Sequence, residues 1–370
     1  VAGIASAGLV WWTNWVTIRP WHKAKDQHWA EQSRLVYPVV VAARSNLWVI
    51  PATVALVVAT FRAHSFPLCV FAGVASAAGC YAGTLPLNRE VYPRIGLKEL
   101  FRLGVIGYFF SFLYLAGFLV ILVMMPNEFN FEAGCFGLLT LCLVEFWRRG
   151  MMMRLGEKIG WYEPAPERLR RIVNETAARM QVEVREIRLI RIPIAQALAL
   201  PGRGTVMFTE RALEIFTDEE IAAIAAHELA HLTESRGVLL ARKIGLLAFL
   251  PWVYFNPVIH LYGLFGFTGL GLLTLAVGSV SRRISRRLEV RADTMAFHNE
   301  LNEGTYARAL LRLHEDNLIP AVMAKNRSTH PHLYDRLLAA GITPNFPRRS
   351  RRMRWQGTAI CARGCWELRR

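Results

Sequence analysis

Long apolar segments recur along this sequence of 370 residues, and they constrain its fold more than any other feature. Hydrophobic residues make up 53% of the chain, more than is usual for a soluble protein. Several segments reach the length of about 20 residues that a helix needs to cross a bilayer. They are residues 1–18, 46–61, 66–85, 105–125, 129–147, 238–255 and 258–280. We therefore expect a mostly α-helical integral membrane protein, a multi-span bundle of about seven spans.

Three of these segments allow a second interpretation. Segment 46–61 is short, and segment 129–147 contains Glu132 and Glu145, so either could be re-entrant or interfacial instead of spanning. Segment 1–18 could be a leftover signal-like segment. Its tryptophans favour an anchored span with interfacial aromatic residues.

Basic residues predict the orientation of the chain, whose formal net charge is +16. They gather in residues 19–45, 86–104, 148–149, 282–287 and 348–354, and the alternate connections are short and poor in base. With seven spans all the basic segments fall on one side, which the positive-inside rule makes cytoplasmic. Anionic lipid headgroups explain this charge better than nucleic acid does, so we expect lipid partners and no nucleic acid.

The strongest chemical signal is the run His227-Glu228-Leu229-Ala230-His231. Two histidines four residues apart lie on one face of a helix, so both imidazoles can reach one zinc ion. The surrounding sequence predicts such a helix. Thr217 and Glu220 form a capping box, apolar residues follow at helical spacing, and Gly237 is a plausible stop.

Glu228 lies about 100° around the helix from His227, which places its carboxylate beside the metal. There it can act as the general base that takes a proton from a water activated by zinc. The alternative is an amphipathic helix with two chance histidines.

A catalytic zinc needs a third protein ligand, and Glu289 is the candidate. Asp293 follows one turn later and could hold the other ring nitrogen of a ligating histidine. By itself this segment is better explained as a solvated helix face with ordinary ion pairs to Arg286 or Arg291. The preceding motif favours the zinc interpretation.

Together, His227-Glu-Leu-Ala-His231 and Glu289-Val-Arg-Ala-Asp293 resemble the membrane zinc metallopeptidases that include the CAAX prenyl protease and the HtpX-type heat-shock protease. The resemblance extends over residues 168–341. It implies an endopeptidase with one Zn²⁺ per chain, bound by His227, His231 and Glu289, and with Glu228 as the base.

The resemblance also implies residues that contact substrate. Residues 194–213 are similar to the family's Asn-Ala stretch, strand and short helix, so Gln196, Ala197 and Leu198 would bind substrate, although Gln196 stands where the family usually has Asn. Residues 328–336 are similar to the family's Thr-His-Pro segment with its following arginine. Arg336 would then bind substrate, and His330 would hydrogen-bond the oxyanion. Alternatively, His330 is a loop residue capping a helix at 333–340.

The segments around the motif predict a small α+β domain. Residues 167–180 have helical periodicity, residues 182–184, 187–192 and 205–208 are typical of strands, and residues 201–204 form a turn. A small sheet beside the zinc helix could bind an extended peptide by strand addition.

We expect five regions in the chain. Residues 1–147 form an N-terminal transmembrane region of about five spans, and residues 148–237 form the first half of the peptidase domain. A transmembrane hairpin around Asn256-Pro257 occupies residues 238–280. The second half, with the third ligand, covers residues 281–346, and a basic disordered tail covers residues 347–370.

The sequence thus predicts a membrane-embedded zinc endopeptidase, in the bacterial inner membrane or another cellular membrane. It would cut membrane-associated proteins or peptides near the cytoplasmic surface. The alternatives are CAAX-type processing of prenylated peptides and a catalytically inactive zinc-binding scaffold. A zinc transporter fits less well, because its ligands should lie inside spans.

Overall fold

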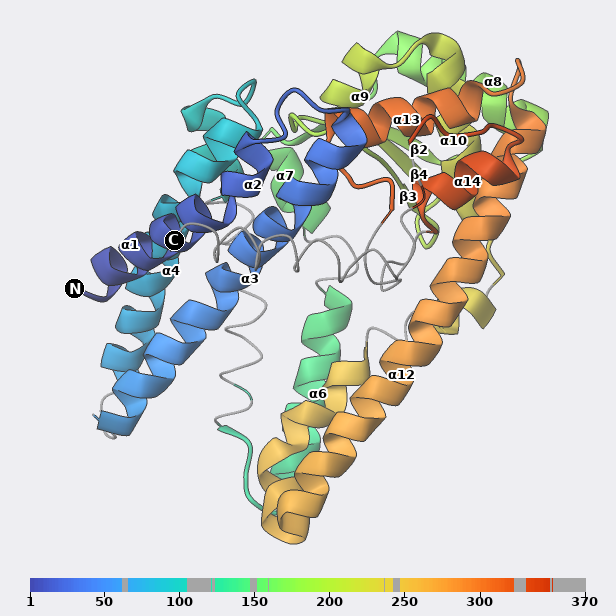
Figure 1. The fold of residues 1–370 in the computed structure, drawn as a ribbon. Coiled ribbons are helices and arrows are strands. Elements are labelled where there is room, and N and C mark those ends of the chain that lie inside the picture. The colour runs from blue at the N-terminus through green and yellow to red at the C-terminus, as the bar shows by residue number, and fades with distance from the viewer. Residues whose placement is uncertain are drawn as a thin grey trace, which may run out of the picture.

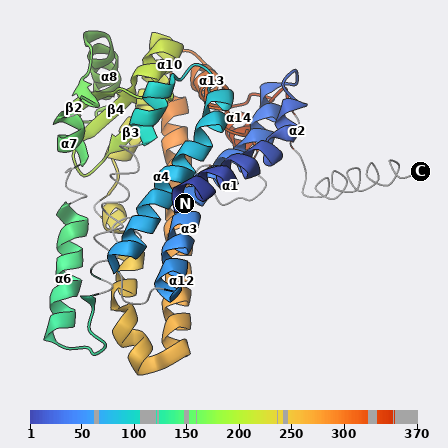
Figure 2. The ribbon, with the colours of Figure 1, turned by 90° about the vertical axis from the view of Figure 1, so that its left-hand side faces the viewer.

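The computed structural model of the chain describes residues 1–61, 66–104, 121, 124–146, 152–158, 160–235, 237–241, 247–322, 331–346 and 348. A helical N-terminal region comprises α1 (Ala2–Thr17), α2 (Arg19–His22), α3 (Trp29–Phe61), α4 (Phe66–Val91), α6 (Phe131–Phe146) and α7 (Met152–Lys158). The long helices project to one side of a smaller α+β domain (Figures 1 and 2).

The α+β domain is built around a sheet of four strands in the order β1-β2-β4-β3. These strands are β1 (Tyr162–Pro164), β2 (Glu186–Ile190), β3 (Ala197–Leu200) and β4 (Thr205–Thr209). Strands β2 and β4 pair in parallel, and the two outer pairs are antiparallel. Strand β3 therefore forms an edge of the sheet.

Helices cover this sheet and complete the domain. They are α8 (Glu167–Met180), α9 (Glu210–Ile215), α10 (Asp218–Leu232), the last turns of α12 (Phe255–Asn299), α13 (Thr305–Asp316) and α14 (Leu333–Ala339). The core contains residues from all of these helices and from β4, among them Leu169, Phe208, Ile221, Tyr306 and Leu337.

Helix α10 is buried on every side, because it packs against α8, α12, α13 and β3. Its alanines at positions 222, 223, 225, 226 and 230 allow these close neighbours, and they are all buried. The predicted capping box is confirmed, with Thr217 and Glu220 bonding each other's backbone N–H. The predicted stop at Gly237 is wrong. Helix α10 ends at Leu232, where the Thr233 hydroxyl donates to the Ala230 carbonyl.

Two of the three predicted strands are confirmed, as is the helix at residues 167–180. Residues 182–184 are not a strand, because Val182 closes the end of α8 by donating its N–H to the Ala177 carbonyl. The basic segment 19–45 is not a loop either. Most of it belongs to α2 and to α3, which continues through it into the apolar segment 46–61.

Seven spans are not supported. Within the described residues two helical stretches are long and apolar enough to cross a membrane, Trp29–Ala55 and Leu250–Asn299. Helices α1 and α6 have 16 residues each, fewer than the about 20 that a span needs. The apolar run of α4 is diluted by small and polar residues such as Gly79 and Ser76, which pack against α1. Most of the predicted segment 105–125 lies outside the described residues.

Within the described residues, the apolar part of the chain that leads to Glu289 contains a 3₁₀ helix, η2 (Leu247–Tyr254), followed directly by α12. The predicted turn at Asn256-Pro257 is wrong, since both residues lie in the first turn of α12, where proline is tolerated. The helix is kinked instead at Gly263, whose non-helical φ of 55° and ψ of −135° suit glycine. From there α12 runs without a second non-helical residue to the last turns beside α10 (Figure 1).

Candidate metal centre

Helix α10 presents His227 and His231 one turn apart on the same face. Their ring centroids are 5.0 Å apart and the rings are nearly perpendicular, at 83°. Both side chains are buried. Both imidazole rings therefore lie on one side of the regular helix, where they can reach a common position. We call this position the metal point.

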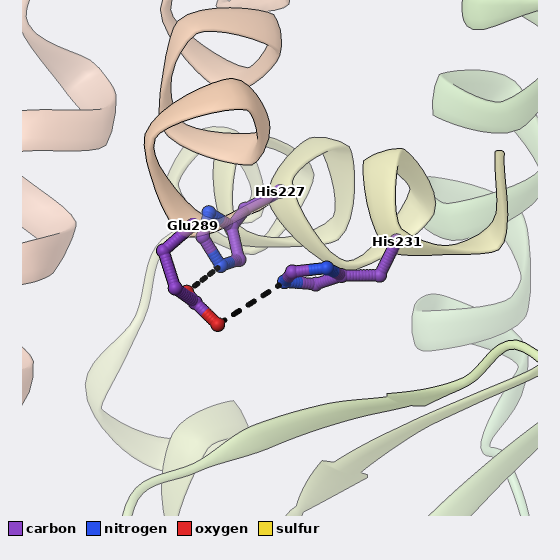
Figure 3. Close-up of side chains that lie close together, drawn as sticks. All are labelled: His227, His231 and Glu289. Atoms are coloured by element: carbon purple, nitrogen blue, oxygen red, sulfur yellow. Dashed lines mark ion pairs between the residues drawn. The ribbon is translucent and has the colours of Figure 1, made fainter. Parts of the chain in front are cut away.

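Glu289 reaches this point from α12 (Figure 3). Its carboxylate oxygens lie 3.5 Å from Nε2 of His227 and 3.8 Å from Nε2 of His231. One ligand atom from each of the three residues lies within 4.8 Å of the others. Ligands at about 2.0–2.1 Å around a tetrahedral zinc are themselves about 3.3 Å apart. The separations to Glu289 are only slightly larger, and two imidazoles with one carboxylate are a donor set that zinc prefers, so these residues fit the ion.

Glu228 occupies the next position of α10 after His227 and is also buried. Its charge is close enough to stabilise the protonated form of His227. Glu228 is therefore near the ligand His227 without being one of the three residues whose ligand atoms converge.

Behind His227, away from the metal point, lies a hydrogen-bonded group of three buried side chains. Nδ1 of His227 is 3.1 Å from Oδ1 of Asp293 and 2.7 Å from the hydroxyl of Tyr306. Tyr306 donates its hydroxyl proton to Asp293 at 2.9 Å. The N–H of His227 therefore belongs on Nδ1, which leaves the Nε2 lone pair directed toward the metal point.

Arg336 completes this group. Its Nε and Nη2 donate to the two carboxylate oxygens of Asp293 at 2.8 and 2.6 Å, and Nη2 also donates to Tyr306 at 2.8 Å. The guanidinium is buried, so the bidentate pair balances a charge that would otherwise be costly to bury. We predicted that Arg336 binds substrate. Its contacts are with Asp293 and Tyr306, whereas the other three predicted substrate residues lie in β3 or directly before it.

His231 has an equivalent partner that the sequence analysis missed. Oε1 of Glu234, a buried side chain three residues further on, lies 2.9 Å from Nδ1 of His231. Each histidine thus has a carboxylate beside its Nδ1 atom. The i, i+3 spacing of His231 and Glu234 was the signal in the sequence for this contact. Nothing in the sequence pointed to Tyr306, which comes from α13.

The carboxylates change the acid–base behaviour of His227. Burial by itself lowers the pKa of the imidazole, but the bonds to Asp293 and Glu289 and the charge of Glu228 together raise the pKa to about 9. Burial raises the pKa of Tyr306 well above its ordinary value, so the phenol stays a proton donor. Without metal, His227 therefore holds a proton at neutral pH, and a metal ion must displace it.

The predicted substrate residues lie where β3 begins. The backbone of Gln196 bonds Thr209, while its side chain is exposed. Ala197 and Leu198 pair with Phe208 and Met207 of β4, and Leu198 is exposed. Helix α10, which carries the histidines, packs against β3, and β3 is an end strand of the described sheet. His330 lies outside the described residues.

Comparison with known proteins agrees with this site. Residues 165–341 match the model of peptidase family M48, a range that contains the whole metal centre. The α+β domain is thus similar to this family, in agreement with the resemblance to the CAAX prenyl protease and HtpX-type enzymes noted in the sequence. A protein described as a protease HtpX homolog, from Aquifex aeolicus (strain VF5), is 40% identical over 83 residues. That alignment covers 22% of this chain and 27% of the relative, so the match spans about a quarter of the relative's length.

Proposed function

We propose that this chain is a membrane-embedded zinc endopeptidase. The convergence of His227, His231 and Glu289 within 4.8 Å, with Glu228 beside them, is the observation that carries the proposal. The match of residues 165–341 to peptidase family M48 supports it. One Zn²⁺ held by these three residues would supply Lewis acidity toward the scissile carbonyl and toward a water molecule.

Residues of the chain itself transfer the proton, position the histidines and bind the substrate. Glu228 accepts the proton of the attacking water and later passes it to the leaving amine. The Nδ1 atoms of the two histidines are held by Asp293, Tyr306 and Glu234, which keeps both Nε2 atoms directed at the metal. The edge of β3 binds the substrate as an added strand, which extends the peptide and exposes its scissile bond.

The long helices support a membrane location. Helix α12 exposes large apolar residues along its first half, and Arg282, Arg283, Arg286 and Arg287 follow that stretch. Glu289 comes nine positions after Val280, the last exposed apolar residue of the stretch, and nine helical residues rise about 13 Å. The metal centre then lies just outside the hydrocarbon layer, with the arginines at the height of anionic headgroups.

The same basic residues suggest the orientation. The start of α3 and the last turns of α12 lie beside the α+β domain (Figure 1). Basic residues occur in α2, in early α3 and shortly before those last turns of α12. Positive charge flanking spans favours the cytoplasmic side. The active site would therefore face the cytoplasm and cut protein or peptide substrates close to the membrane surface. The basic tail at residues 347–370, proposed to add to lipid binding, lies almost entirely outside the described residues.

The variant Glu228→Gln tests the proposed chemistry. It keeps the shape of the side chain and removes the base, so cleavage of an unfolded membrane protein by purified full chain in lipid should fall by roughly 10²–10⁴-fold. The zinc content should stay at one ion per chain. Glu219→Gln is the matched control, because Glu219 is an exposed residue on the same helix. Cleavage by Glu228→Gln at the parent rate would refute the assignment of the base.

The same preparation separates the alternatives. Cleavage that requires a prenyl group on the substrate would favour CAAX-type processing. One zinc ion per chain without any chelator-sensitive cleavage by the parent would favour the inactive scaffold. Identifying membrane-protein fragments that disappear from cells carrying Glu228→Gln would then name the substrates.

A further inference from the structure

Three consecutive residues at the end of α13, Asp316, Asn317 and Leu318, connect parts of the chain that are distant in sequence. We call them the α13 corner. Asn317 contacts Ala195, two residues before β3, Asp316 pairs with an arginine that follows α4, and Leu318 packs among N-terminal helices. The metal centre described above uses none of them.

Asn317 holds the start of the edge strand. Its side-chain oxygen accepts the N–H of Ala195 at 3.1 Å, and its amide nitrogen donates to the carbonyl of the same residue at 2.6 Å. Both residues are buried. This pairing resembles that of a neighbouring strand, because one partner satisfies both backbone groups.

On the other side of the strand, Thr209 at the end of β4 holds the next residue. The Gln196 N–H donates to the Thr209 hydroxyl and the Thr209 N–H donates to the Gln196 carbonyl, both at 2.9 Å. The backbone entering β3 is thus held from two sides. The position of the strand depends on both Asn317 and Thr209.

Asp316 connects the α13 corner to the N-terminal region through an ion pair. Its Oδ1 accepts from Arg94, three residues after α4, and from Arg211 of α9, each at 2.6 Å. The carboxylate side chain is only 10% exposed, so these two guanidinium groups neutralise a largely desolvated charge.

Leu318 makes the second connection. Its φ of 49° is in the left-handed region, which residues with a side chain adopt rarely and which glycine usually occupies after a helix. Its side chain packs against the cluster that contains Trp21, Val36, Leu87 and Val91. A strained backbone persists where surrounding contacts hold it, and here the contacts come from the N-terminal helices.

We propose that Asn317 is a positioning residue for the substrate-binding edge of β3, and that Asp316 and Leu318 set its position from the N-terminal helices. A displacement of α2, α3 or α4 would move the corner and, through Ala195, the strand that receives substrate. The substrate part of this inference rests on the proposed peptidase function. The link between the N-terminal helices and β3 does not.

Amide hydrogen exchange of the full chain in lipid nanodiscs tests the link without any substrate. Asn317→Ala should accelerate exchange in residues 195–200 by about tenfold, because two hydrogen bonds to one buried residue are lost. Arg94→Ala and Leu318→Ala should accelerate exchange in the same residues by about threefold. Asn299→Ala is the control, since its amide bonds a carbonyl of its own helix and should leave residues 195–200 unchanged.

Kinetics on a water-soluble extended peptide tests the substrate part. Asn317→Ala should raise KM by about tenfold with kcat within about twofold, and zinc content should equal that of the parent. A purely structural role would lower zinc content and accelerate exchange throughout the domain, which would overturn the proposal. Unchanged exchange in residues 195–200 for Arg94→Ala and Leu318→Ala would overturn the link. Accelerated exchange in the three variants, together with a parent that cleaves no peptide, would support the link and refute the peptidase function alone.

Discussion

The two ends of α12 reverse the usual distribution of residues in a soluble protein. Toward its start the helix exposes Phe265 and Leu275, at 90% and 64% of their surface. Toward its end it buries the carboxylates Glu289 and Asp293, at 7% and 6%. In an aqueous protein leucine and phenylalanine are among the most buried residue types, and aspartate and glutamate are almost never fully buried unless they are paired.

This difference teaches that burial in this chain is set by the available partners. The carboxylates are buried because imidazole and guanidinium groups satisfy them. The apolar end has no such cover from the described residues, since only 11% of its most apolar window is buried. Lipid as the medium around the apolar end would give both ends a favourable environment. The predictions below test each end of the helix.

Removing Arg336 should have the largest effect at the polar end. Arg336→Met leaves the Asp293 carboxylate buried without its bidentate partner, which should lower the free energy of unfolding by about 3–5 kcal/mol. Resistance of the α+β domain to proteolysis in increasing denaturant measures this. The control is Arg170→Met, which removes an exposed pair with Glu167 and should cost roughly 0–1 kcal/mol. Equal losses in the two variants would mean that pairing does not explain the buried carboxylates.

A lysine in the apolar end should cost slightly less. Leu272→Lys places a charge on an exposed position, which would be neutral in water but should cost about 3 kcal/mol at the centre of a bilayer. The fraction of chain inserted into membranes of expressing cells measures it. Val290→Lys is the matched control, because Val290 is exposed on the same helix beside the metal centre. If Leu272→Lys inserts as well as Val290→Lys, the two ends face the same solvent and the comparison fails.

The smallest of the three effects should come from Glu234. Glu234→Gln keeps the side chain's length and weakens its bond to His231, which should reduce zinc affinity by about 10- to 100-fold without loss of stoichiometry at high zinc. Competition with a chromophoric chelator measures this. Glu289→Ala, which removes a ligand itself, should lose more. An unchanged zinc affinity in Glu234→Gln would mean that the second carboxylate does not support the site.

The local features of the metal centre could be predicted because they depend on residues close together in the sequence. The spacing of His227 and His231, the capping box at Thr217 and the helix at residues 167–180 each follow from helical periodicity. Glu289 could be proposed because a zinc site with two histidines lacks a ligand and the next acidic pair occurs at helical spacing. The structure brings it to the histidines, although the role of each residue remains a prediction.

Other features depended on contacts between distant segments. Tyr306 and Arg336 join His227 only because α13 and α14 pack against α10 and α12, and no periodicity records such a contact. The bond of Asn317 to Ala195 is of the same kind. The prediction of seven spans is not supported by the described residues, for a related reason. Apolar composition does not distinguish a span from a helix such as α1, whose small residues pack against a neighbour.

The sequence alone determined which residues can bind zinc and which face of α10 carries them, because helix geometry relates neighbours by a constant rotation. Tertiary structure decided what surrounds them. The proton on Nδ1 of His227, the buried position of Arg336 and the attachment of β3 to the α13 corner all arise where separate helices meet. Such contacts depend on packing in three dimensions, which brings together groups that have no regular spacing along the chain.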